Sequence, residues 1–70
     1  MRRRQVDSSA IRSMGYDPES RTLEVEFWSG SVYDYFGVSS HLWESFRAAP
    51  SKGSFFAREI RGRFPSEPAG

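Results

Sequence analysis

The sequence predicts a small α+β domain, in which a three-stranded antiparallel meander is followed by two helices packed on one face (β-β-β-α-α). Three observations predict it. The chain has 70 residues and no cysteine, so it forms one domain whose thin core has no disulfide. Apolar and charged residues alternate in "TLEVEFW", which is typical of a strand. After residue 40, apolar residues recur every three or four positions, which is typical of helices.

The three strands are expected in the first half of the chain, in "AIRSMGY", "TLEVEFW" and "SVYDYF". Asp17-Pro18 marks the turn between the first two, because proline and aspartate favour the backbone angles of turns. In the second strand, Leu23, Val25 and Phe27 form the apolar side. The third strand returns after Ser29-Gly30 as the second arm of a hairpin.

The length of this hairpin loop decides which face of the sheet the third strand presents to the core. A two-residue loop would bury Asp34. A three-residue loop that ends at a left-handed Gly30 would instead pair Val25 with Tyr33. We favour the three-residue loop because it keeps a carboxylate out of the core.

The two helices are expected in "HLWESFRAA" and "KGSFFAREIR". Ser39 or Ser40 can cap the first helix and Ser51 the second, because a serine hydroxyl can accept a hydrogen bond from a free N–H of the first turn. Pro50 ends the first helix. The polar segment 1–7 and the proline-containing segment 65–70 are expected to be flexible tails, which leaves residues 8–64 as the domain.

Three segments, in this order, resemble the KTSC domain family, which occurs at the C-terminus of some lysyl-tRNA synthetases and as short stand-alone proteins. They are "SSAIRSMGYDPESRTLEVEFWSG", "YDYFGV" with its Tyr-x-Tyr signature, and "APSKGSFFAREIRGRF". Ser39 stands where family members commonly have proline. The resemblance implies RNA binding as a function to test, attached to Tyr33, Tyr35, Ser51, Lys52 and Gly53.

The charge distribution agrees with an anionic partner. The net charge is only +1, but residues 17–44 carry −5 while the segments before and after carry +3 each, which can create a local field that attracts anions. The free N–H groups of a helix start near Ser51 can bind a phosphate, although a simple serine cap explains the same residues. The candidate nucleic-acid-binding residues are Ser51, Lys52, Gly53, Arg58, Arg61 and Arg63.

The aromatic residues allow a second hypothesis, a protein-interaction module such as an adaptor or small inhibitor. Tyr33 and Tyr35 point to one face of their strand, where they are either core residues or a platform for stacking bases. Trp28 and Phe36 are expected on the opposite, outer face, where they could anchor a protein partner or a second copy of the chain.

Other classes of function lack the residues they need. His41 is the only histidine, so a nucleophile pair has one possible base, and we expect no enzyme activity and no small-molecule substrate. No metal motif is present, and we expect no cofactor. No apolar run approaches the roughly 20 residues of a membrane span, so we expect no membrane association and a cytoplasmic location.

Overall fold

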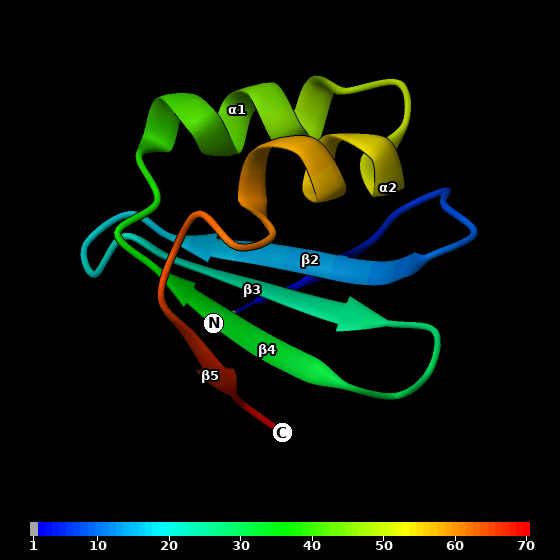
Figure 1. Ribbon diagram of the computed structural model, residues 1–70, viewed down its shortest axis with the longest axis horizontal. Helices are drawn as coiled ribbons and strands as arrows, with labels where there is room; N and C mark the ends of the chain where they lie inside the picture. The colour runs from blue at the N-terminus through cyan, green and yellow to red at the C-terminus, as the bar shows by residue number, and fades with distance from the viewer. Residues whose placement is uncertain (1) are drawn as a thin grey trace.

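The computed structural model describes residues 2–70, and its strands form one antiparallel sheet in the order β1-β2-β3-β4-β5. Two helices and a π-helical turn cover one face of this sheet (Figure 1). The strands are β1 (Arg4–Gln5), β2 (Ile11–Asp17), β3 (Thr22–Phe27), β4 (Val32–Phe36) and β5 (Ser66–Pro68). The helices are α1 (Ser40–Ala48) and α2 (Lys52–Phe55), and α2 continues into the π-helical turn η1 (Phe56–Ile60).

The α+β class is confirmed, but the prediction of three strands was wrong, since the sheet has five. The two additional strands, β1 and β5, come from segments 1–7 and 65–70, for which only tails were predicted. They are two and three residues long and show no apolar alternation. They are strands because their backbones pair with β2 and β4. Every non-proline residue carries the N–H and C=O groups for such pairing, so the sequence does not mark these positions.

The hairpin loop between Phe27 and Ser31, which connects β3 to β4, has the predicted three residues, 28–30. The Gly30 N–H donates to the Phe27 carbonyl, and the Phe27 N–H donates to the Ser31 carbonyl, both at 2.9 Å. Gly30 has a φ of 100°, which glycine adopts without steric cost. Val25 therefore pairs with Tyr33, and the predicted register is confirmed.

The core lies between the sheet and the helices, and aromatic rings join the two layers. Phe46 of α1 stacks on Phe55 of α2 with ring centroids 5.3 Å apart. Phe56 meets Phe27 and Tyr35 edge to face, at 5.3 and 5.4 Å. The side chains buried with no exposed surface are Ile11, Leu23, Val25, Val38, Phe46 and Ile60. Tyr35 is also buried in this core, and Tyr33 is partly buried and packs against it.

Serine caps begin both helices, as predicted. The Ser39 hydroxyl accepts a hydrogen bond from the Leu42 N–H at 3.1 Å, and the Ser51 hydroxyl accepts one from the Ser54 N–H at 3.3 Å. α1 ends before Pro50. None of the helices formed by residues 2–70 is long and apolar enough to cross a membrane.

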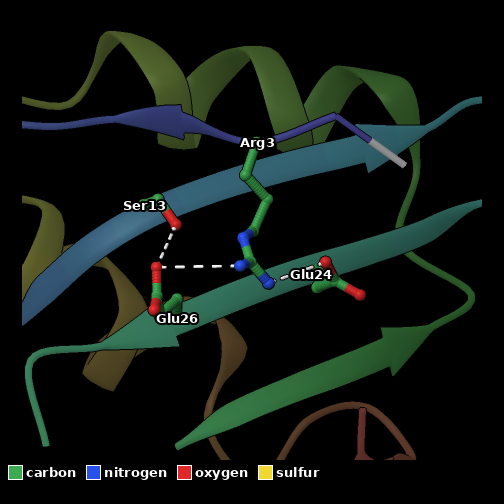
Figure 2. A network of polar contacts seen from close by, with 4 residues as sticks. All are labelled: Arg3, Ser13, Glu24 and Glu26. Carbon is green, nitrogen blue, oxygen red and sulfur yellow. Dashed lines mark hydrogen bonds and ion pairs between the residues drawn. The ribbon is translucent and has the colours of Figure 1, made fainter. Parts of the chain in front are cut away.

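The N-terminal segment crosses β2 at Gly15, where the two backbones approach closely. A Cβ atom at Gly15 would lie 2.4 Å from the Arg2 carbonyl oxygen. On the outer face of the sheet, Arg3 forms an ion pair of 2.9 Å with Glu24 and one of 3.7 Å with Glu26. Ser13 donates a hydrogen bond of 2.8 Å to Glu26, which completes this network (Figure 2). Arg2 and Arg3 are thus held against the sheet.

Asp34 lies on the same outer face as these carboxylates. Burial raises the pKa of Asp34 to about 6, with further increases from a hydrogen bond and the charge of Glu24 and from the charge of Glu67, while Arg3 opposes them. Like charges in a partly buried place favour the protonated form of a carboxyl group.

We predict that Gly15→Ala destabilises the protein by about 1–3 kcal/mol, because the new methyl group overlaps the Arg2 carbonyl and pushes the N-terminal segment off the sheet. Urea unfolding measures the change. Gly53→Ala is the matched control, since its Cβ would meet Ala10 at an ordinary 3.5 Å, and it should cause no loss. Equal stability of Gly15→Ala and the wild type would contradict the close crossing.

We predict that the stability contributed by Asp34 falls as the pH rises from about 4 to 6. In this interval the unfolded chain, with an ordinary pKa of 3.8, has released the proton that the folded state still binds. The free energy of unfolding therefore decreases as the pH increases through this interval. Asp34→Asn should remove this slope from urea midpoints measured across the interval, whereas Asp7→Asn, at an exposed position, should keep it. An unchanged slope in Asp34→Asn would refute the assignment.

Candidate nucleic-acid interface

Charge is separated between the two faces of the molecule. The helical layer, which we define as residues 40–63, carries five basic and two acidic residues. The basic residues are Arg47, Lys52, Arg58, Arg61 and Arg63. The outer face of the sheet instead carries Glu24, Glu26 and Asp34, with Glu67 of β5 paired beside Asp34. The first surface is therefore richer in positive charge, and the second is richer in carboxylates.

The predicted phosphate site at the start of α2 forms a hollow of about 420 Å³. Ser51, Lys52 and Gly53 line it together with Asp7, which adds a negative charge. The Lys52 ammonium donates a hydrogen bond of 2.5 Å to the Ala49 carbonyl. The lysine therefore caps the end of α1, and phosphate binding in this hollow stays a prediction.

The other three predicted basic residues do not line that hollow. They form a separate group at the end of η1, which we call the η1 patch (Arg58, Arg61 and Arg63). The guanidinium carbon of Arg58 lies 5.9 Å from the Phe55 ring centroid, and that of Arg61 lies 5.6 Å from Phe56. Arg63 Nε donates to the Arg58 carbonyl at 2.9 Å. All three side chains remain exposed.

A second hollow, which the sequence analysis missed, lies between β1 and α1. The β1–α1 hollow has a volume of about 270 Å³ and an apolar wall. The apolar side chains of this wall are Val6, Met14, Tyr16 and Trp43, and its basic side chains are Arg2, Arg4 and Arg47. For the N-terminal arginines the sequence predicts either a flexible tail or nonspecific phosphate contacts, and for Tyr16 and Trp43 it predicts only apolar positions. No local pattern in the sequence indicates that these residues lie close together in the fold.

A stacked pair of aromatic rings forms the back of the β1–α1 hollow. The rings of Tyr16 and Trp43 are 5.5 Å apart and inclined by 11°. The Tyr16 hydroxyl donates a hydrogen bond of 2.6 Å to the Val38 carbonyl, which holds the ring against the chain entering α1. One turn later on α1, Arg47 pairs with Glu44 at 2.5 Å. Both side chains are more than half exposed, so the pair contributes little and leaves Arg47 available.

Arg2 and Arg4 form no ion pair with any residue in the range 2–70, whereas Arg3 between them is paired on the outer face. No acidic side chain lines the β1–α1 hollow within that range. The hollow therefore combines an aromatic wall with an uncompensated positive charge.

The two aromatic residues predicted as a protein interface do not form one surface. Trp28 is 54% exposed and lies in the loop after β3, with Arg12 stacked on its ring at 5.2 Å. Its Nε1 donates to the Ser8 carbonyl at 2.9 Å. Phe36 is half-buried at the opposite end of the hairpin, where it pairs with Thr22. Protein binding through these residues stays a prediction.

The fold and the charge distribution define a small single α+β module. The family model for the KTSC domain matches residues 7–64, and the chain belongs to this family. The resemblance is thus confirmed. Within residues 2–70, no group of three or more His, Cys, Asp or Glu side chains is placed to hold a metal ion.

Known proteins similar to this chain are of two kinds. The lysine–tRNA ligase of Nostoc punctiforme is 43% identical over 61 residues, which are 87% of this chain but only 11% of the ligase. A protein of Stutzerimonas stutzeri is 45% identical over 56 residues and is matched over 79% of its own length. The crystal structure of a KTSC domain protein from Yersinia pestis superposes with a TM-score of 0.93 at 43% identity, covering 99% of this chain and 97% of that one.

We predict that Tyr16→Phe lowers the free energy of unfolding by about 1 kcal/mol, because it removes the hydrogen bond to Val38 while it keeps the ring that stacks on Trp43. Tyr33→Phe is the matched control, since the Tyr33 hydroxyl forms no hydrogen bond within residues 2–70, and it should change stability less. Urea unfolding of both variants provides the comparison. A larger loss for Tyr33→Phe would contradict the role assigned to Tyr16.

Proposed function

We propose that the chain is an RNA-binding module that holds the phosphate backbone on its helical layer and on the adjoining edge of β1. The separation of charge between the two faces carries this proposal. Five basic residues lie in the helical layer, whereas the carboxylates of β3 and β4 lie on the other side of the sheet. Neutralisation of phosphates by such side chains supplies most of the affinity of nonspecific nucleic-acid binding.

Two further observations support the proposal. The η1 patch presents planar guanidinium groups, which match the geometry of phosphate oxygens better than lysine does. Lysine–tRNA ligases occur among the relatives, and the substrate in their name is an RNA, which favours RNA over DNA.

The proposed function predicts a salt-dependent affinity for RNA. Fluorescence anisotropy of a labelled single-stranded RNA should show binding at low ionic strength that weakens linearly with salt on a double-logarithmic plot. Arg58→Ala combined with Arg61→Ala should flatten this line by roughly 0.7 for each phosphate that is no longer neutralised. Arg12→Ala, which lies outside the helical layer, should leave the slope unchanged. The absence of binding at low ionic strength, or an unchanged slope in the double variant, would refute the proposal.

A further inference from the structure

We infer that the β1–α1 hollow takes one unpaired nucleotide of the bound RNA, with the base against its apolar wall and the phosphate at its arginines. The inference rests on the proposed function and adds to it a preference for single-stranded RNA. None of the sequence motifs predicts that a ligand binds in this hollow.

The size and the walls of the hollow suit a base. Its volume of about 270 Å³ lies just below the range of roughly 300–1,000 Å³ that is typical of sites for drug-sized ligands. The hollow therefore suits a fragment such as a base with its sugar. Tyr16 and Trp43 line it, and aromatic side chains are the common stacking partners of unpaired bases.

The positive charge of the hollow favours a ligand that joins a base to a phosphate group. Arg2, Arg4 and Arg47 approach it from two elements that are far apart in the sequence. Guanidinium groups bind phosphate oxygens in a bidentate manner. A neutral or cationic ligand would leave this charge uncompensated, so a nucleotide is favoured over a purely apolar group.

The positions of the N-terminal arginines follow from how the segment crosses the sheet. Gly15 allows the backbone of Arg2 to approach β2 closely, and the ion pairs of Arg3 hold the segment on the outer face. Successive side chains of an extended chain point in opposite directions. Since Arg3 points to the outer face, its neighbours Arg2 and Arg4 point toward the hollow, where both line the wall. Arg3 thus anchors the segment to the sheet, while Arg2 and Arg4 face the proposed ligand.

A duplex cannot place a base in this hollow without breaking a base pair, because its bases are paired and stacked within the helix. A short single-stranded RNA should therefore bind more tightly than a duplex with the same number of phosphates, and the difference should depend on the hollow. The η1 patch is expected to bind phosphates and should contribute to both affinities.

The test uses the full chain with Trp28→Phe, which leaves Trp43 as the only tryptophan. Its fluorescence is recorded during titration with a single-stranded RNA, with a duplex of equal phosphate count and with adenosine monophosphate. We expect the single strand to change the Trp43 signal and to bind more tightly than the other two probes. Arg4→Ala combined with Arg47→Ala should weaken single-strand binding by about tenfold, since the variant removes two charge-assisted hydrogen-bonding groups. Duplex binding should change much less, and Arg12→Ala is the matched control for both probes.

The outcomes separate the inference from the function it rests on. One outcome is RNA binding without a change in Trp43 fluorescence and without a loss of affinity in the variant Arg4→Ala, Arg47→Ala. In that case the hollow is not the binding site, and the proposed function stands. If the duplex binds as tightly as the single strand, or adenosine monophosphate as tightly as the RNA, the inference is overturned. If no RNA binds at low salt, the proposed function and the inference both fail.

Discussion

The three-residue hairpin loop 28–30, which connects β3 to β4, is the constraint on which the rest of the structure depends. Side chains alternate along a strand, so a loop shorter by one residue would turn every side chain of β4 to the opposite face. Tyr33 and Tyr35 would leave the core and Asp34 would enter it. Gly30, with its φ of 100°, provides the left-handed position that this loop requires. The edge-to-face contact of Tyr35 with Phe56, which helps join the second helix to the sheet, exists only in this register.

The same alternation separates the charges of the molecule. With Leu23 and Val25 buried under the helices, Glu24 and Glu26 must point to the outer face. Arg3 is the basic residue that compensates them there (Figure 2). The basic residues of the second half of the chain lie in the helical layer on the other side. A small domain whose fold is stabilised by one buried sheet face thus acquires one surface rich in basic residues and one rich in carboxylates.

The central strands, their register and both helix caps could be predicted, because local patterns specify them. The strands β1 and β5 could not, since they are short, polar and formed by backbone pairing with β2 and β4. At the site, the prediction gathered Lys52 and the arginines of the η1 patch around the start of α2. The structure separates them, because Lys52 Nζ is bound to the Ala49 carbonyl and the η1 patch lies at the other end of that helical segment.

By itself, the sequence determined which residues share the core, because alternation in the strands and the three-to-four spacing in the helices place their apolar side chains on one face. It also determined that positive and negative charges would be separated. Only the tertiary structure decided which of the arginines lie together. Arg4 and Arg47 line one hollow because β1 pairs with β2, the segment before β1 crosses β2 at Gly15, and α1 packs above them. That arrangement depends on backbone hydrogen bonds and on the space left by a missing side chain, and neither leaves a periodic pattern in the sequence.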